Sequence, residues 1–409
     1  MNVKPSRSFR WRLSFPGLVT LVLGVALFAW LGAPAATQAQ SLSFTDVPAS
    51  NPYHLPIEVL AELGVVAGKP DGNFHPNDPV TREQFAKMLV LAMRISASPT
   101  DQCSFVDVPQ SAGSDLYPDH YIAAAAAKGI VTGYVEAGKP VFRPYAPITL
   151  AQLVTMGTRA SARPLRQVPG GYESSWGDFN KDLAPFAAEA QYNGLLQGFN
   201  LTKMSPWRSA TRAEAAAFLF NVMGTDPAAL NGRFLGTAAD LANYFRSAGH
   251  TSGKFTVSLD SLAQLYVTYG ARFGIRADMA WAQMIHETGF GNYGGDVSPA
   301  QNNFAGIGAV GGGAPGNSFA TAELGVIAQY VHLACYLYPE DLPDPDCVLS
   351  SDPTKPGDPR YFTTASRRGS VRTVFDLDGK WAVPGNGYGA AIQKLADGVM
   401  QTAGWPSAL

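Results

Sequence analysis

Charge and cysteine are both scarce in this sequence. Charged residues make up 15% of the 409 residues, and the formal net charge is -2. The chain therefore lacks the basic excess of proteins that bind nucleic acid or anionic membrane surfaces, and neither partner is expected. Its length exceeds what one ordinary hydrophobic core holds, so two or more domains are predicted.

Only three cysteines are present. Cys335 and Cys347 have eleven residues between them and lie in a half of the chain with no other cysteine, a pattern that favours a disulfide. The alternative is a nucleophilic Cys335 served by His332, one helical turn earlier, but no third orienting group is nearby in the sequence. Cys103 is left without an assigned role.

A long apolar run occurs once, as "GLVTLVLGVALFAWL" at residues 17–31. Lys4, Arg7, Arg10 and Arg12 precede it, and the small residues "GAPAATQAQ" follow it. This order predicts a secretory signal peptide over residues 1–39, with cleavage after Ala39. The alternative is an uncleaved membrane anchor. Either way, the protein is expected to be secreted and to work outside the cytoplasm.

Residues 42–224 contain a pattern that occurs three times. "SFTDV" at 43–47 returns as "SFVDV" at 104–108 and more loosely as "WGDF" at 176–179. "LGVVAG", "KGIVTG" and "NGLLQG" place their first glycines 65 residues apart both times. "NFHP", "VFRP" and "KMSP" follow, and then "TREQ", "TLAQ" and "TRAE". Three copies of one structural unit are predicted.

Each copy has the pattern of two helices joined by a loop. The first helix carries apolar residues at helical spacing and ends at a glycine that can adopt positive φ. The second begins with Thr81, Thr149 or Thr211, followed three residues later by Gln or Glu, which is a capping box. Capping accounts for the threonines but not for Arg82 and Arg212, which are replaced by Leu150 in the second copy.

These motifs together resemble the surface-layer homology (SLH) module. The predicted copies span residues 42–98, 103–162 and 171–225. The resemblance implies a helical trimer around a pseudo-threefold axis that binds an acidic secondary cell-wall polysaccharide, with the arginines pairing with ligand carboxylates. A purely structural trimer is the alternative. The wall-binding residues implied by the resemblance are Asp46, Gly68, Arg82, Gly198 and Arg212.

From residue 226 a different pattern begins. "ADMAWAQMIHETGFG" predicts an apolar helix that ends near Gly289 or Gly291, with Glu287 in its last turn. The negative end of the helix dipole and apolar neighbours both disfavour the charged carboxylate, so a raised pKa suited to a general acid is expected. The rival interpretation, a zinc site of the H-E-x-x-H type, fails because residue 290 is Phe290. No metal and no cofactor are expected.

The loop after this helix is rich in glycine and in residues suited to an acetamido sugar. Asn302 and Asn303 offer amides, and Phe304 offers an apolar face. Here the chain resembles the glucosaminidase domain of peptidoglycan hydrolases (glycoside hydrolase family 73). The residues that carry the likeness are Ala282-Gln283, "ETGFG" at 287–291, "NNFAGIG" at 302–308, "DPRY" at 358–361, and Trp381 with Tyr388 in "WAVPGNGYGAAI". Phe290 stands where the family has tryptophan.

The resemblance implies a lysozyme-like α+β domain over residues 226–409, in a protein that is mainly α. It implies Glu287 as proton donor, Tyr388 beside it, and sugar contacts from Asn302, Asn303, Phe304, Phe290 and Trp381. Glycosidases usually use two carboxylates, and Asp296 and Glu323 are the candidates for the second; substrate-assisted catalysis by the N-acetyl group is the alternative.

The sequence therefore predicts an S-layer-associated, cell-wall-anchored enzyme that cleaves the β-1,4 bond after N-acetylglucosamine in peptidoglycan. The rivals are a lytic transglycosylase or muramidase and a non-catalytic wall-binding protein.

Overall fold

Helices account for most of the regular structure in the computed structural model, which describes residues 44–177, 180–251, 253–338, 352–355, 357–362 and 365–407. The predicted signal segment and Cys347 lie outside these residues. None of the described helices is long and apolar enough to cross a membrane. The two strands among the described residues are β1 (Tyr134–Glu136) and β2 (Lys139–Val141), which form an antiparallel hairpin. The mainly helical fold is therefore confirmed.

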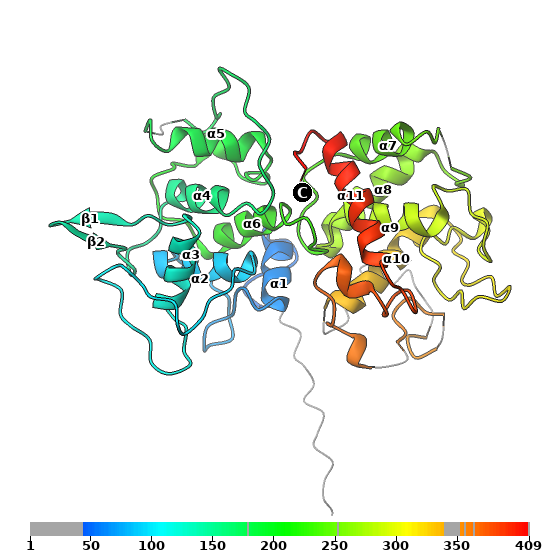
Figure 1. Cartoon of the computed structure of the whole chain (residues 1–409), viewed down its shortest axis with the longest axis horizontal. Coiled ribbons are helices and arrows are strands. Elements are labelled where there is room, and N and C mark those ends of the chain that lie inside the picture. Colours follow the sequence, from blue (N-terminus) through cyan, green and yellow to red (C-terminus); the bar gives the residue numbers. More distant parts are fainter. Residues whose placement is uncertain are drawn as a thin grey trace, which may run out of the picture. The chain divides into compact units, whose positions relative to one another are not determined.

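Three helix pairs occupy the first half (Figure 1). They are α1 (His54–Glu62) with α2 (Arg82–Ala92), α3 (Asp119–Ala127) with α4 (Leu150–Arg159), and α5 (Ala184–Tyr192) with α6 (Arg212–Met223). The first helix of each pair is followed by a glycine with positive φ: Gly64, Gly129 and Gly194. The second helix begins with the predicted capping box at Thr81, Thr149 and Thr211, with both hydrogen bonds formed. The helix–loop–helix prediction is confirmed in each copy.

A closed ring of backbone hydrogen bonds joins the three pairs. The Val80 amide donates to the Ala210 carbonyl (3.0 Å), the Ala210 amide to the Ile148 carbonyl (2.8 Å), and the Ile148 amide to the Val80 carbonyl (2.9 Å). All three side chains are fully buried. Because each copy donates to one neighbour and accepts from the other, the pairs are arranged with approximate threefold symmetry.

The second half is built from α7 (Ala238–Ser247), α8 (Leu259–Phe273), α9 (Ala277–Thr288), α10 (Ala322–Leu337) and α11 (Tyr388–Thr402). Helices α9 and α11 pack together, as do α8 and α10 (Figure 1). The described residues from 226 onward form helices and isolated bridges but no strand, in keeping with the mainly α fold. In the glycine-rich segment, Gly306, Gly308 and Gly311 adopt left-handed φ values that a pleated strand does not accommodate.

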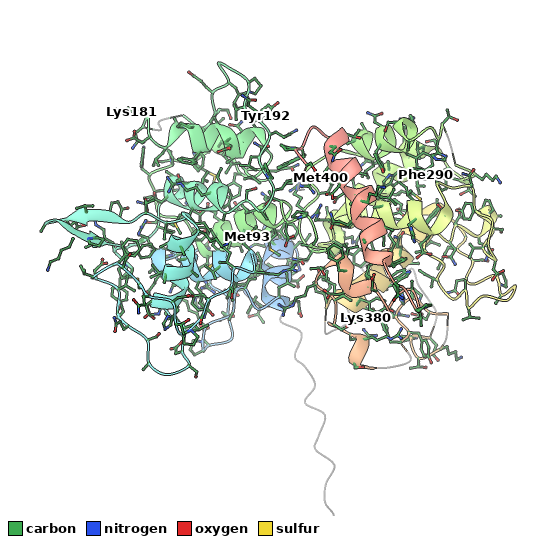
Figure 2. The ribbon with its side chains drawn as sticks, in the orientation of Figure 1. Met93, Lys181, Tyr192, Phe290, Lys380 and Met400 are labelled. Carbon is green, nitrogen blue, oxygen red and sulfur yellow. The ribbon has the colours of Figure 1, made fainter. Side chains whose placement is uncertain are left out.

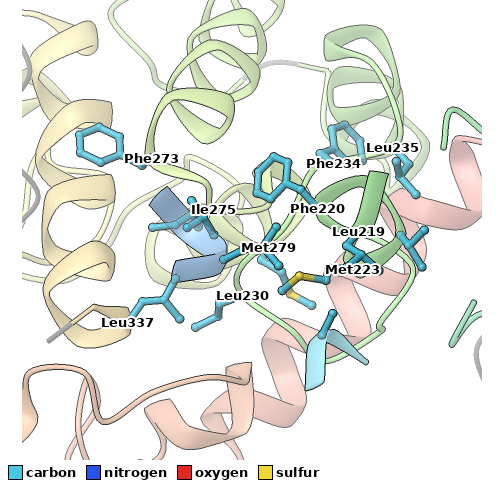
Figure 3. Close-up of a cluster of buried hydrophobic side chains, with 14 of the residues drawn as sticks. Leu219, Phe220, Met223, Leu230, Phe234, Leu235, Phe273, Ile275, Met279 and Leu337 are labelled. Carbon is cyan, nitrogen blue, oxygen red and sulfur yellow. The ribbon is translucent and has the colours of Figure 1, made fainter. Parts of the chain in front are cut away.

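One hydrophobic core runs from α6 into the second half. Figure 3 shows Phe220 and Met223 of α6 in the same cluster as Ile275 and Met279. Residues 41–409 accordingly form a single compact unit. Buried residues on both sides of residue 226 therefore belong to one cluster, and the domain boundary at 226 stays a prediction.

A buried ion pair also ties the segment after α4 to α11. Arg163 is 1% exposed, and its Nη2 donates to Asp397 Oδ1 at 2.7 Å. Arg166 adds a bond from Nη1 to the Ala403 carbonyl (3.3 Å). Helix α11, which begins with Tyr388, is therefore held from the side of the repeats as well as by α9.

Candidate active site

Glu287 lies where α9 meets the glycine-rich loop. Helix α9 is buried along almost its whole length and ends at Thr288, because Gly289 takes the left-handed conformation (φ 55°) that terminates a helix. The Glu287 side chain is partly buried. The predicted position in the last helical turn is confirmed.

Burial raises the pKa of the Glu287 carboxyl, while hydrogen bonds from Tyr388 and Trp381 act in the opposite direction. Removal from water disfavours the carboxylate more than these donors favour it, so the carboxyl holds its proton to a higher pH than an exposed glutamate does. This is the direction required for a general acid.

Tyr388 is the first residue of α11, and its hydroxyl donates to Glu287 Oε1. The carboxylate of Asp378 fixes the start of this helix by accepting from the amides of Gly387 (3.1 Å) and Gly389 (2.6 Å). Tyr388 is 6% exposed, and burial, followed by the nearby Glu287, raises its pKa well above the usual value. The phenol is therefore a permanent hydrogen-bond donor at neutral pH.

A chain of buried side chains sets the direction of that donation. Gln329 Nε2 donates to the Ala280 carbonyl and to Gln283 Oε1, both at 2.9 Å, and Gln283 Nε2 donates to the Tyr388 oxygen at 2.9 Å. A backbone carbonyl only accepts, so the Ala280 contact fixes the Gln329 amide and through it Gln283. At the far end, the Tyr266 hydroxyl donates to Gln329 Oε1.

This polarity decides which carboxyl oxygen of Glu287 carries the acidic proton. Because the Tyr388 oxygen accepts from Gln283, its proton points to Glu287 Oε1, and the acid's own proton is left to Oε2. Oε2 lies 3.4 Å from where a Cβ on Gly306 would stand. Oε2 therefore faces the backbone of the "NNFAGIG" loop at a glycine, where no side chain covers it.

A cleft of about 620 Å³ lies beside the glycine-rich loop, and neither Glu287 nor Tyr388 is among its lining residues. Gly306 and Trp381, which both approach Glu287, are among its lining residues. Trp381 packs edge-on against His332 (4.6 Å between ring centroids) and lies near Tyr336 (5.8 Å). The structure therefore brings Glu287, Tyr388 and Trp381 together, and adds an aromatic wall from α10.

Asn302 and Asn303 hold the loop from inside. Asn303 is 1% exposed; its Nδ2 donates to the carbonyls of Ile307 (2.9 Å) and Asn317 (3.1 Å), and its Oδ1 accepts from the Ile307 amide (3.0 Å). Asn302 donates to the Phe319 carbonyl (3.0 Å) and accepts from Thr256. These amides shape the loop, and the predicted direct sugar contact has no support in this geometry.

Two predicted aromatic contacts also lie away from the acid. Phe304 is 1% exposed and packs against Phe255. Phe290 stacks on His250 with centroids 4.1 Å apart. Figure 2 shows Phe290 well separated from Lys380, which lines the cleft. Both rings belong to the packing that supports the loop. Of the aromatic residues predicted to contact the sugar, Trp381 is the one that lines the cleft.

The candidates for a second carboxylate have no contact with Glu287 in the part of the chain that the structure describes. Asp296 is exposed on the loop after α9. Glu323 begins α10 and accepts from the Tyr269 hydroxyl at 2.6 Å. Cys335 is buried in α10, and the predicted pairing with Cys347 falls outside the described residues. No cluster of three metal-ligating side chains occurs in the described ranges.

The SLH-type residues lie at the junctions between copies. Arg82 is 6% exposed, donates from Nε to the Phe142 carbonyl (2.8 Å) and lies over the Phe142 ring. Arg212 repeats this arrangement on Phe74, with the same 2.8 Å bond. Both arginines therefore hold a neighbouring copy, whatever else they bind.

The third junction is apolar. Leu150 replaces arginine and is fully buried, and Met204 replaces phenylalanine. The Met204 carbonyl, which has lost its arginine donor, accepts instead from Trp176 Nε1 at 2.6 Å. Trp176 stands where the first two copies have Phe44 and Phe105, and its indole N–H supplies the Met204 carbonyl with a donor in place of an arginine.

The remaining wall-binding candidates have different surroundings. Asp46 accepts from the amides of Phe74 (2.9 Å) and His75 (2.6 Å), which holds the loop between α1 and α2. A Cβ on Gly68 would stand 2.7 Å from the Phe44 ring, so close packing against that ring favours glycine at this position. Gly198 lines a hollow of about 650 Å³ in the third copy.

Sequence reasoning gave no role to Gln283 and missed Gln329 and Tyr266. The available signal was a glutamine inside the apolar run "LGVIAQYVHL", because a buried amide needs partners. Their connection to Tyr388 depends on four helices meeting, α8, α9, α10 and α11, which periodicity does not reveal.

Comparisons with known families match two parts of the chain. Residues 43–86 match the S-layer homology domain, and residues 263–368 match the family described as mannosyl-glycoprotein endo-beta-N-acetylglucosaminidase. The chain thus carries an SLH domain and a glucosaminidase domain. The first match covers only the first of the three helix pairs, and the second includes Glu287 but ends before Trp381 and Tyr388.

Individual relatives share part of their length with this chain. An uncharacterized protein of Borreliella burgdorferi is 34% identical over 124 residues, which are 30% of this chain and 55% of that protein. The S-layer protein EA1 of Bacillus anthracis is 29% identical over 211 residues, 50% of this chain and 23% of EA1. An uncharacterized cell wall amidase of the same species is 27% identical over 209 residues, 49% of this chain and 36% of the amidase. The chain therefore spans about half or less of the length of these relatives.

Proposed function

We propose that this protein is a cell-wall-anchored peptidoglycan hydrolase that cleaves the β-1,4 bond following N-acetylglucosamine. The observation that carries the proposal is the Glu287 carboxyl, whose pKa is raised by burial and which lies beside Tyr388 at the edge of an aromatic-lined cleft. The glucosaminidase match over residues 263–368 supports the same reaction class.

Glu287 acts as the general acid. The proton on Oε2 is transferred to the glycosidic oxygen as the bond breaks, and Tyr388 stabilises the carboxylate that forms on Oε1. Trp381 supports the sugar ring from the cleft wall, where the negative π face of the indole favours the positive charge of the oxocarbenium-like transition state.

In this proposal the N-acetyl group of the substrate takes the place of a second catalytic carboxylate. Neither Asp296 nor Glu323 contacts Glu287 among the described residues, and Glu323 is already bonded to Tyr269. In the first step the acetamido oxygen bonds to the anomeric carbon while the glycosidic oxygen leaves with the proton from Glu287, which removes the need for a nucleophilic carboxylate. In the second step water gives a proton to the Glu287 carboxylate and displaces the acetamido oxygen, so two displacements give retention of configuration.

The three helix pairs anchor the enzyme to its substrate in this proposal, as three SLH modules bound to a secondary cell-wall polysaccharide. The SLH match at residues 43–86, the repeated junctions and the likeness to an S-layer protein support a location at the cell surface. Anchoring to the wall keeps the enzyme at a high local concentration of its glycan substrate.

Glu287→Gln tests the assignment, because glutamine keeps the size and the acceptor for Tyr388 but carries no acidic proton. Lysis of purified sacculi is expected to fall by roughly 10²-fold or more, with unchanged binding to the walls. Equal lysis by variant and wild type would show that the acid is wrongly assigned.

The released ends separate this reaction from its nearest alternative. A glucosaminidase leaves reducing N-acetylglucosamine, whereas a muramidase leaves reducing muramic acid and a lytic transglycosylase leaves an anhydro end. Mass analysis of the digest therefore decides the bond that is cut, independently of which residue donates the proton.

A further inference from the structure

The cleft that contains Gly306 and Trp381 is also lined by two positively charged side chains. Arg367 and Lys380 both line it, next to Trp381. Lys380 lies on the segment that precedes α11 (Figure 2). Its sequence neighbour Trp381 forms a hydrogen bond with Glu287, so Lys380 is adjacent in sequence to a residue that contacts the acid.

These two cations are bonded to carbonyls and not to acids. Arg367 Nη1 donates to the Lys380 carbonyl (2.9 Å), and Lys380 Nζ donates to the Ser370 carbonyl (2.7 Å). Neither forms an ion pair with a carboxylate of the described residues. Asp376 interacts electrostatically with Lys380, and its carboxylate also accepts hydrogen bonds from the amides of Arg372 and Thr373.

The other titratable groups of the cleft do not cancel this charge. Asp358 is 5% exposed, and its carboxylate is engaged by Arg360 at 3.0 Å. His332 is neutral at physiological pH, because burial lowers its pKa to about 4, with Arg367 and Arg368 adding to the effect. Among the lining residues that the structure describes, the positive charges therefore outnumber the negative ones.

We propose that Arg367 and Lys380 form a subsite for a carboxylate carried by the glycan strand, which selects muramyl-containing glycans over neutral ones. The proposal rests on the function proposed above and extends it to the choice of substrate. Neutral glycans, such as chitin oligomers and the mannosyl glycans in the description of the matched family, offer no such group. A muramyl unit offers one or the other of two sources: the free lactyl carboxylate where no peptide is attached, or the carboxylates of the stem peptide where the lactyl group is amidated by it.

Binding of soluble tetrasaccharides to the full-length Glu287→Gln chain tests the subsite without turnover. In this background, Lys380→Met and Arg367→Gln are each expected to weaken binding of a muramyl tetrasaccharide roughly tenfold to a hundredfold, as loss of a charge-assisted bond does. Binding of chitotetraose should stay unchanged. Lys394→Met, which removes an exposed lysine from α11, is the matched control and should affect neither ligand.

The ligands distinguish the source of the carboxylate. Loss of affinity with the peptide-free tetrasaccharide identifies the lactyl group, and loss only with the peptide-bearing form identifies the stem; either result supports the subsite. Equal weakening of chitotetraose, or no change with any ligand, would overturn it. Wild-type lysis of sacculi is measured separately, so a chain that binds selectively but does not lyse would refute the enzymatic function and leave the subsite standing.

Discussion

Tyr388→Phe isolates the hydrogen bond that opposes the effect of burial on Glu287. The substitution keeps the ring and removes the donor to Oε1, and it leaves Gln283 Nε2 buried without its acceptor. A hydrogen bond to a charged group contributes about 1.5–3 kcal/mol, which corresponds to about one to two pKa units. The pKa of Glu287 is therefore expected to rise further, because its carboxylate loses a stabilising partner while its protonated form loses little.

The sign of the effect appears in the pH dependence of kcat/KM. The general acid must be protonated, so activity is lost as pH rises through the pKa of Glu287, and the alkaline limb of the variant should lie about one to two pH units higher. The rate at the optimum should fall, since Tyr388 no longer stabilises the carboxylate formed in the transition state. The assay is hydrolysis of purified sacculi across pH, with reducing ends measured.

Tyr338→Phe is the matched control. This tyrosine is also buried, and its hydroxyl donates to the Phe273 carbonyl (3.0 Å), away from the acid. It should lose stability without a shift of the alkaline limb. An unmoved or lowered limb in Tyr388→Phe would contradict the direction of donation inferred from Gln283.

Three further outcomes are expected. Glu287→Gln should be more stable than wild type near neutral pH, because the raised pKa of Glu287 in the folded state means that its ionisation destabilises the folded chain as pH rises. The difference in thermal midpoint between variant and wild type should therefore vanish in acid, where Glu287 is protonated. A difference that stays constant with pH would argue against a raised pKa. Asp397→Ala should lower the free energy of unfolding by about 3–5 kcal/mol in urea titrations, because it leaves the buried guanidinium of Arg163 uncompensated; a loss below about 1 kcal/mol would mean that water reaches the pair. Replacing Arg82 and Arg212 together by alanine should reduce both the thermal midpoint and co-sedimentation with purified walls, since both side chains join neighbouring copies; full wall binding by a folded variant would refute the ligand role of the arginines.

The local elements of this protein were predictable because their causes are local. The capping boxes at Thr81, Thr149 and Thr211 and the helix ends at Gly64 and Gly289 depend on residues within one turn of each other. The position of Glu287 in the last turn of α9 followed from the same rules.

Side-chain roles in the glycine-rich loop were less predictable. Asn302 and Asn303 have the chemistry of sugar ligands, but amides are equally suited to satisfying the backbone of a loop that has no strand partner. The structure assigns them to the second task, because their partners are carbonyls of the loop itself and of Phe319. Composition alone does not distinguish an amide that faces inward from one that faces a ligand.

The sequence by itself determined the threefold repeat, the helical character and the position of one acid at a helix end, since each depends on spacing along the chain. Only the tertiary structure decided which oxygen of Glu287 holds the proton, because that depends on Tyr266, Gln329 and Gln283 meeting from three helices. It also decided that Arg367 and Lys380 share a cleft with Trp381, and that a Trp176 donor replaces a missing arginine. Long-range contacts of this kind follow from packing, and packing leaves no periodic trace in a single sequence.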